Sequence, residues 1–213
     1  YFFKIFSPLK LDFPDTVFNP VVKQEGDLSV REALLNIGLD EDEEFITLHP
    51  GTSKVERSWH VERFGILCQK IFKADGKKLV LLGTKSEEEL LNRIKSYCPP
   101  GKVKVTPVMN LRVLAGVLKK SRLFVGNDSG MMHLAAMVGT PVVGIFGPGN
   151  PDTTGPYMPP ENCEILTQNY SCSPCRQRFF KECKPSPHNK PYCLEDITVK
   201  NVYEAIHRLM RRA

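Results

Sequence analysis

The residues with the clearest potential for chemistry lie in one short stretch of the chain, residues 126–133. A strand-like apolar run ends where this stretch starts, and an apolar helical run begins near Gly130, so Asp128 or Ser129 is expected to cap that helix. Gly130 leaves the first turn bare, so that backbone N–H groups there can reach a phosphate. A histidine in an apolar helix is more often a core residue, but His133 lies one turn inside this helix start and can point at the same place. The stretch therefore predicts a phosphate-binding helix start.

A second polar stretch, residues 49–54, follows another strand-like run. Gly51 permits close approach of the backbone. Hydroxyls come from Thr52 and Ser53, and positive charge comes from a lysine and from Arg57, just ahead of a predicted helix. These groups suit an anionic ligand, although an ordinary polar loop with a capping serine explains the pattern equally well on its own. No Gly-Lys-Ser/Thr follows at the spacing of a P-loop, which excludes that phosphate-binding loop.

Two further loops also follow predicted strands. After the run 78–82, Ser86 can cap the next helix and Glu87 can complement its dipole. A carboxylate at the end of a second strand can also accept hydrogen bonds from ribose hydroxyls, as in dinucleotide-binding folds. The residues alone favour the capping interpretation. The stretch 146–151 predicts only a tight turn.

These polar stretches are positioned by a regular alternation of strands and helices. The expected strands are 45–49, 78–82, 103–105, 123–126, 141–146 and 163–166. The expected helices are 28–37, 61–72, 87–97, 111–120, 131–138 and 198–212. Such alternation predicts an α/β fold with an open, doubly wound parallel sheet of the Rossmann-like kind. In sheets of this kind ligands bind at the carboxyl ends of the strands, where all four loops begin.

Length and composition limit the domain organisation and the ligands that are compatible with this fold. The chain has 213 residues, of which 41% are hydrophobic, and a formal net charge of +5. This length suits one large domain, or one domain plus appendages. We expect residues 1–38 to form an interdomain connector with a short helix, and residues 39–213 to form a nucleotide-sugar-binding domain that includes a cysteine-rich segment (172–193) and a C-terminal helix. The small charge excess fits an anionic small molecule as well as nucleic acid, and no specific nucleic acid is predicted. No apolar run is long enough to span a bilayer and no secretory signal is recognisable, so the expected location is the cytoplasm.

Four of the seven cysteines lie close together in the segment 172–193. They are Cys172, Cys175, Cys183 and Cys193. Their number and the leading Cys-x2-Cys pair suit a structural zinc ion, with His188 as a spare ligand. Free thiols, or one opportunistic disulfide, are the slightly favoured alternative.

Taken in order, the loops resemble those of the ADP-heptose:lipopolysaccharide heptosyltransferase family, which is glycosyltransferase family 9. The resemblance is carried by Gly51-Thr52-Ser53 with Arg57 and Trp59, Gly83 with Glu87, Asp128-Ser129-Gly130 with His133, Ala135 and Ala136, and Pro141 with Phe146-Gly147-Pro148. It covers nearly the whole chain from about Gly38 onward. The family has a two-domain GT-B fold, and the resemblance implies that this chain corresponds to the C-terminal, donor-binding domain. It also implies inverting transfer of a heptose in lipopolysaccharide core synthesis, with no cofactor or catalytic metal required.

The resemblance assigns the diphosphate to two of the loops. It implies that the side chains of Thr52, Ser53 and Arg57 hold the diphosphate, together with the backbone amides of Ser129 and Gly130. The family's usual basic residue before the tryptophan is Lys, and here it is Arg57. Because arginine can bind a diphosphate through two parallel hydrogen bonds, Arg57 can take the role of the lysine.

The remaining roles concern the nucleoside and the sugar. The resemblance implies that Glu87 takes the ribose hydroxyls, that Met109 packs on the adenine, and that Asp128 contacts the sugar hydroxyls. His133 would support the same region. The catalytic base of the family lies in an N-terminal acceptor domain, which nothing in residues 1–30 can supply. We therefore expect no catalytic base in this chain, and donor binding with negligible transfer.

Two alternatives stay open at this point. The same diphosphate loops would serve a glycosyltransferase with a uridine- or GDP-sugar donor. A stand-alone, non-catalytic nucleotide-binding module is also consistent with the sequence, its basic cysteine-rich tail contacting anionic lipid or RNA. In the favoured interpretation the partners are a nucleotide-sugar donor, a lipopolysaccharide-core acceptor and the N-terminal domain of the same enzyme. The enzyme would then work in the cytoplasm or peripherally at the inner membrane face.

Overall fold

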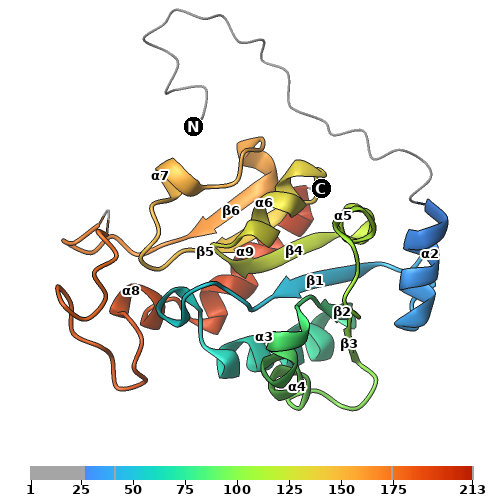
Figure 1. Cartoon of the computed structure of the whole chain (residues 1–213), viewed down its shortest axis with the longest axis horizontal. Helices are drawn as coiled ribbons and strands as arrows, with labels where there is room; N and C mark the ends of the chain where they lie inside the picture. Colours follow the sequence, from blue (N-terminus) through green and yellow to red (C-terminus); the bar gives the residue numbers. More distant parts are fainter. Residues whose placement is uncertain (1–26, 41, 174, 213) are drawn as a thin grey trace, which may run out of the picture.

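The computed structural model describes residues 27–40, 42–173 and 175–212, and its centre is a parallel sheet of six strands (Figure 1). The strand order is β3-β2-β1-β4-β5-β6. The strands are β1 (Phe45–His49), β2 (Lys78–Leu81), β3 (Val103–Val105), β4 (Leu123–Asn127), β5 (Val142–Ile145) and β6 (Cys163–Leu166). Every neighbouring pair is parallel, which confirms the predicted open, doubly wound α/β fold. The order reverses between β1 and β4, and ligands bind at such a reversal, at the carboxyl ends of the strands.

Helices cover both faces of the sheet (Figure 1). One face is covered by α3 (Val61–Asp75), α4 (Glu88–Lys95) and α9 (Val199–Arg212), and the other by α2 (Asp27–Asn36), α5 (Leu111–Lys120) and α6 (Gly130–Met137). Shorter elements lie in the connections, namely η3 (Val55–Arg57), η4 (Lys85–Glu87), α7 (Pro151–Thr154), η5 (Pro160–Asn162) and α8 (Tyr192–Glu195). In the described part of the chain, no helix is long and apolar enough to cross a membrane.

The central strands are apolar on both faces. On β4, Leu123 and Val125 belong to the core under α3, α4 and α9, whereas Phe124 belongs to the core under α2, α5 and α6. Strand β2 alternates in the same way. Successive strand residues point to opposite faces, so two-sided burial makes these strands unbroken apolar runs in the sequence.

The starts of two helices test the predicted caps. Thr198 caps α9 as expected, its hydroxyl accepting from the backbone N–H of Asn201 at 3.2 Å. The prediction that Ser86 caps the helix after β2 is wrong, because Thr84 is the N-cap of η4 and Glu87 is the N-cap of α4. The backbone N–H and hydroxyl of Thr84 donate to the Glu87 carboxylate at 2.7 and 2.9 Å. A charged carboxylate forms stronger hydrogen bonds with these donors than a hydroxyl would.

Helix α2, which the sequence places in the connector, packs against the domain. Its side chains Val30 and Leu34 are buried in the core under α5 and α6. Val30 lies against Gly116 of α5, where a Cβ would come within 2.2 Å of Val30 Cγ2. The rest of the predicted connector, residues 1–26, lies outside the described residues.

We predict that Gly116→Ala destabilises the domain. The added methyl group overpacks the α2–α5 contact at a cost of about 1–3 kcal/mol, which exceeds the gain of about 1 kcal/mol that alanine has over glycine inside a helix. Urea denaturation followed by circular dichroism measures the change. Adding Val30→Ala should recover part of the loss, whereas no recovery would show that contact with α2 is not its cause.

Candidate functional site

One buried amide ties the carboxyl ends of β1 and β4 together. Asn127 is fully buried, and its Nδ2 donates to the carbonyl of Pro50 at 2.7 Å while its Oδ1 accepts from the backbone N–H of Trp59 at 3.0 Å. Trp59 is also fully buried and donates its indole N–H to the carbonyl of Ile197 at 2.8 Å. These bonds determine the path of the loop that follows β1. Asn127 was not among the site residues predicted from the sequence, where its only signal is an amide side chain at the end of an apolar strand.

The same loop brings Arg57 to the end of β4. Arg57 Nη2 donates to the carboxylate of Asp128 in an ion pair whose side chains are only 20% and 7% exposed. The turn after β5 lies over this carboxylate, since a Cβ on Gly149 would lie 2.5 Å from Asp128 Oδ2. Arg57 Nε is buried without a hydrogen-bond partner among the described residues. Because buried donors are nearly always paired, this one is available to a ligand.

The Glu87 carboxylate reaches the same crevice from the end of β2. A Cβ on Gly51 would lie 1.7 Å from Glu87 Oε1, so the carboxylate occupies the space that this glycine leaves. Glu87 therefore caps its own helix and also lies against the loop after β1. The two interpretations that the sequence left open are compatible in the structure.

His49, the last residue of β1, lies underneath this loop and is 8% exposed. Its Nδ1 is 3.3 Å from the hydroxyl of Ser129. Its Cε1 is 3.1 Å from the same Cβ position on Gly51 that Glu87 crowds. Burial lowers the pKa of His49, while the charge of Glu87 opposes that shift. His49 was quoted in the sequence as part of a loop, but no role was assigned to it.

The other predicted residues surround this centre with fewer contacts. Thr52 uses its hydroxyl within the loop, donating to the carbonyl of Lys54 at 2.8 Å. Ser53 is exposed, and His133 is half-buried; within the described chain neither side chain forms a hydrogen bond. Met109 is half-buried against the core under α5.

The start of α6 faces open space. A Cβ on Gly130 would meet nothing within 4 Å. The N-cap position is held by Ser129, whose hydroxyl makes no capping hydrogen bond. The first amides of α6, the Arg57 guanidinium and the carboxylates of Asp128 and Glu87 therefore gather at the ends of three neighbouring strands. Amides and a guanidinium suit a phosphate anion, and carboxylates suit the hydroxyls of a sugar or ribose.

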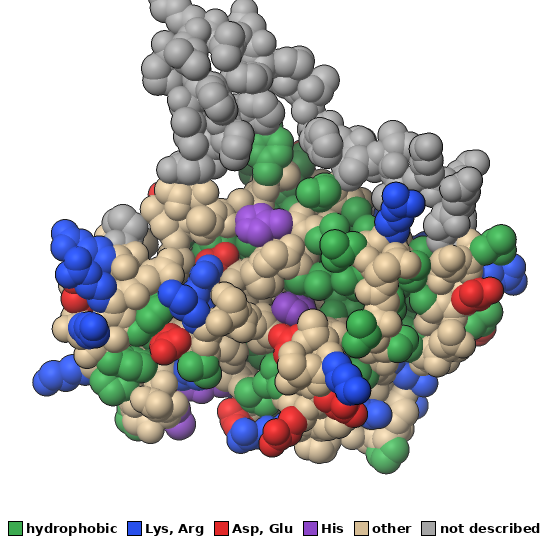
Figure 2. Space-filling model, in the orientation of Figure 1, with side chains coloured by type: hydrophobic (Ala, Val, Ile, Leu, Met, Phe, Trp, Pro, Cys, Tyr) green, Lys and Arg blue, Asp and Glu red, His purple; other side chains and the backbone are tan. Residues whose placement is uncertain are grey.

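A second network holds the cysteine-rich segment against the start of α3. The Glu195 carboxylate accepts from Arg63 at 2.6 Å and from the Ser186 hydroxyl at 2.7 Å, and its oxygens lie 3.2 Å from His60 Nε2 and from His188 Nδ1. These contacts fix the segment beside the loop that carries the site arginine. Basic side chains gather at this end of the molecule (Figure 2), and the exposed ones in the segment are Arg176, Arg178, Lys181 and Lys184.

The four clustered cysteines line one cavity of about 110 Å³, beside the turn after β5. They are Cys172, Cys175, Cys183 and Cys193, all of them free thiols. Burial and the three neighbouring thiols raise the pKa of Cys193 to about 12. Among the described residues, however, no three His, Cys, Asp or Glu side chains form a group that could hold a metal ion. The described side chains are therefore not arranged as a preformed zinc centre. Zinc binding by the four cysteines stays a prediction.

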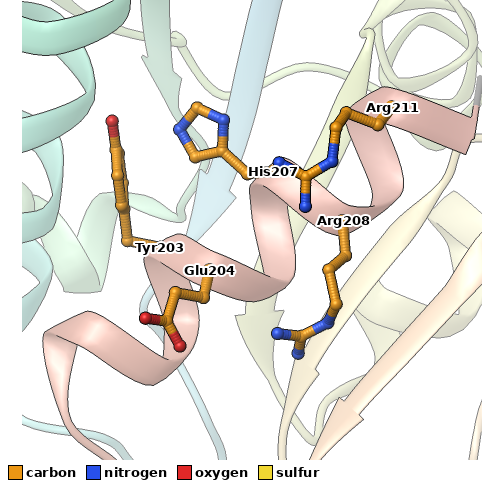
Figure 3. A pocket seen from close by; sticks show the side chains of 5 residues that line it. All are labelled: Tyr203, Glu204, His207, Arg208 and Arg211. Atoms are coloured by element: carbon orange, nitrogen blue, oxygen red, sulfur yellow. The ribbon is translucent and has the colours of Figure 1, made fainter.

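A shallow groove on α9 lies away from these loops. It is lined by Tyr203, Glu204, His207, Arg208 and Arg211 (Figure 3). Tyr203 and His207 both contact Asp75, the last residue of α3, at 3.2 and 3.4 Å. Because α3 starts near the carboxyl end of β1 and runs back along the sheet, this groove lies at the opposite edge from the candidate site.

Together the fold and the strand ends define a class of protein: an open parallel α/β domain with a polar crevice at its topological switch point. Comparison with known proteins narrows the class. The chain belongs to glycosyltransferase family 9, the heptosyltransferases, whose family model matches residues 2–184.

Individual relatives are similar along most of the chain. It is 28% identical over 212 residues to lipooligosaccharide heptosyltransferase 2 of Campylobacter jejuni, covering 98% of this chain and 59% of the relative. The solved family 9 glycosyltransferase of Veillonella parvula aligns with a TM-score of 0.75 at 24% identity, over 90% of this chain and 53% of that one. The E. coli heptosyltransferase WaaC, solved with ADP, aligns with a TM-score of 0.60 at 22% identity, over 84% and 48%. The chain thus spans about half the length of the proteins it matches.

The buried His49 and His60 predict a pH-dependent stability. Burial lowers the pKa of both from the ordinary value of 6.5. Below pH 6.5 the unfolded chain binds protons that the folded chain excludes, so the free energy of unfolding should fall as the pH is lowered from 7 to 5. Urea titrations across this range measure the slope. His49→Asn should make the slope shallower, and an unchanged slope would contradict the neutral state of this residue.

The Cys193 thiol should react slowly. Its pKa of about 12 leaves almost no thiolate at pH 8, so alkylation by iodoacetamide should be much slower than at the exposed Cys172. Mass spectrometry of digests taken over time measures both rates, and rapid labelling of Cys193 would contradict its raised pKa. Elemental analysis distinguishes a protonated thiol from a metal ligand. About one equivalent of zinc that Cys193→Ser removes would support the zinc hypothesis, and less than about a tenth would reject it.

Proposed function

We propose that this domain binds the ADP-heptose donor of an inverting heptosyltransferase that acts in lipopolysaccharide core synthesis. The observation that carries the proposal is the meeting of Arg57, Asp128 and the open start of α6 at the switch point of the sheet. The family membership supports a glycosyltransferase. The relative WaaC, whose solved structure contains ADP, supports the nucleotide.

The arginine would change its partner when the diphosphate binds. In this structure Arg57 pairs with Asp128, and its Nε has no partner in the described chain. A diphosphate offers paired oxygens, which match the planar guanidinium better than a single carboxylate oxygen does. The exchange would release Asp128 to accept hydrogen bonds from the sugar hydroxyls. The two residues would then serve neighbouring parts of one donor molecule.

The other groups would complete the donor site. We assign the phosphates also to Thr52, Ser53 and the amides of Ser129 and Gly130, at the positive end of the α6 dipole. Glu87 lies at the end of β2, the strand beside β1, which is where dinucleotide-binding folds hold the ribose.

Met109 and His133 would contact the adenine ring and the phosphates, respectively. Met109 follows β3 and lies beside two exposed apolar side chains, Val108 and Leu111, which are 71% and 70% exposed. This apolar surface suits an adenine ring, and Figure 2 shows hydrophobic side chains gathered on this side of the domain. His133 would support the phosphates from the first turn of α6.

The chemistry divides between this domain and the rest of the enzyme. Positive charge at Arg57 and at the start of α6 would stabilise the leaving diphosphate, without a metal ion or another cofactor. The acceptor hydroxyl needs a positioned base, and we propose that the base and the lipopolysaccharide-core acceptor site belong to an N-terminal domain. This chain alone would then bind the donor and transfer negligible sugar. The proposed place of action is the cytoplasm or the inner membrane face.

Isothermal titration calorimetry with ADP tests the proposal. The chain should bind ADP, and Arg57→Gln should weaken binding about 10- to 100-fold, because a charge-assisted hydrogen bond contributes about 1.5–3 kcal/mol. Arg57→Lys should retain part of the affinity. Arg211→Gln removes an exposed arginine from the distant α9 groove and is the matched control, which should bind as the wild type does.

Two comparisons separate the alternatives. AMP should lose less affinity than ADP in the Arg57→Gln variant, since the arginine is assigned to the diphosphate. UDP and GDP should bind more weakly than ADP, and an equal or tighter affinity for either would favour another nucleotide-sugar donor. Absence of any binding at millimolar ADP would contradict the proposal.

A further inference from the structure

His49 occupies the point where three strand-end loops meet. It is the last residue of β1, in the middle of the sheet, and it pairs in register with Gly126 of β4. Its imidazole is 8% exposed, between the Glu87 side and the Ser129 side of the crevice. No described residue hydrogen-bonds to its Nε2. Burying an imidazole costs free energy when its polar atoms have few partners, and His49 has one polar contact. The burial of His49 in the candidate site therefore needs a physical explanation.

The partner of His49 is a serine that does not act as a cap. Ser129 holds the N-cap position of α6 with extended backbone, at φ −153° and ψ 164°, as capping serines do. Such a serine normally accepts from the N–H of the second or third helical residue, which here are Met131 and Met132. The Ser129 hydroxyl makes no such bond, and lies 3.3 Å from His49 Nδ1 instead.

The direction of this contact depends on the tautomer of His49. Burial lowers the pKa of His49 and favours the neutral ring, and with the ring proton on Nε2 the Nδ1 atom accepts the Ser129 hydroxyl proton. The hydroxyl is thereby turned toward β1. The first amides of α6 keep no side-chain acceptor, although the space in front of Gly130 is open.

We propose that His49 is a positioning residue that holds the Ser129 hydroxyl away from the first turn of α6 and so keeps the Met131 amide open for an incoming phosphate. This inference rests on the proposed function, because it deepens the assignment of the diphosphate to α6. A serine that capped the helix would compete with the phosphate for the same amide. His49 removes that competition without touching the ligand.

The Glu87 carboxylate, with His49 beside it, explains the glycine at position 51. The ring and the Glu87 carboxylate lie within 3.1 and 1.7 Å of the position that a Cβ of residue 51 would take. The imidazole therefore packs against the loop that carries Thr52, Ser53 and Arg57, and its Nδ1 contacts Ser129 at the start of α6. A single buried side chain of β1 thus contacts both of the loops assigned to the phosphates.

A double-mutant cycle tests the proposal with the 213-residue chain. In His49→Leu the hydroxyl should return to its cap, slowing hydrogen exchange at the Met131 amide and lowering ADP affinity by about tenfold, the size of an N-cap hydrogen bond. His49→Asn should behave as the wild type, because its side-chain oxygen can accept the same proton. Ser129→Ala removes the competing hydroxyl, so adding His49→Leu to it should change neither the exchange rate nor the affinity further.

The outcomes separate the roles of His49. An equal loss of ADP affinity from His49→Leu in both backgrounds would overturn the proposal and indicate a direct or merely structural role. Unchanged Met131 exchange in His49→Leu would also overturn it, and thermal unfolding of each variant identifies a general loss of fold. If the wild type binds no ADP, the proposed function fails, while the exchange measurement still decides whether His49 controls the hydroxyl.

Discussion

The site depends on the parallel pairing of β1 with β4, where the strand order reverses. The helices that follow these two strands leave on opposite faces of the sheet, so the loops between strand and helix diverge and leave a crevice at the strand ends. The buried side chain of Asn127 holds this crevice in shape through bonds to Pro50 and Trp59. A buried amide with both of its groups paired is stable only in one arrangement, because each lost bond would leave a polar group unsatisfied. The loop after β1 is therefore fixed relative to the end of β4.

Two carboxylates and one arginine share the resulting space. The pair of Arg57 and Asp128 is mostly shielded from water, and such a pair gains attraction but loses hydration. The arginine is not fully satisfied by this pair, since Arg57 Nε has no partner in the described part of the chain. An arrangement of this kind is stable enough to keep the groups in place and still able to exchange one partner for a better one. This is the physical property that the proposed donor site needs.

The cysteine-rich segment and the residues that follow it contribute to the same region from the far end of the chain. Glu195 binds Arg63, and the carbonyl of Ile197 accepts the indole N–H of Trp59, so the start of α3 is held from the side opposite to the sheet. Lys190 donates to the carbonyl of Val55 in η3 at 2.8 Å. The turn that carries Arg57 is thus enclosed between the sheet and this segment. A segment that looked like an appendage in the sequence supports the loop assigned to the donor.

The sequence by itself determined the class of fold and the identity of most strands. A strand that is buried on both faces is apolar at most of its positions, and a short apolar run is visible without any knowledge of contacts. Buried Thr47 of β1 is one polar position, and its hydroxyl is paired with that of Ser121. The glycine-bearing helix start at 126–133 was visible for the same reason, since its residues are neighbours in the chain. The predicted roles of these residues came from a resemblance to a family, which the family model supports as a membership and not residue by residue.

Only the tertiary structure decided which of these loops meet. Arg57 and Asp128 are 71 residues apart, and His49 and Ser129 are 80 apart, so no local periodicity could pair them. Their contacts depend on the strand order, which places β4 beside β1 although two strands intervene in the chain. The same holds for the Glu87 carboxylate above Gly51. Thr84 caps in place of Ser86 through hydrogen bonds to Glu87, three residues away, so that difference is a local one. The local sequence pattern determines which face of the sheet a residue lies on, whereas the order of the strands determines which residues it contacts.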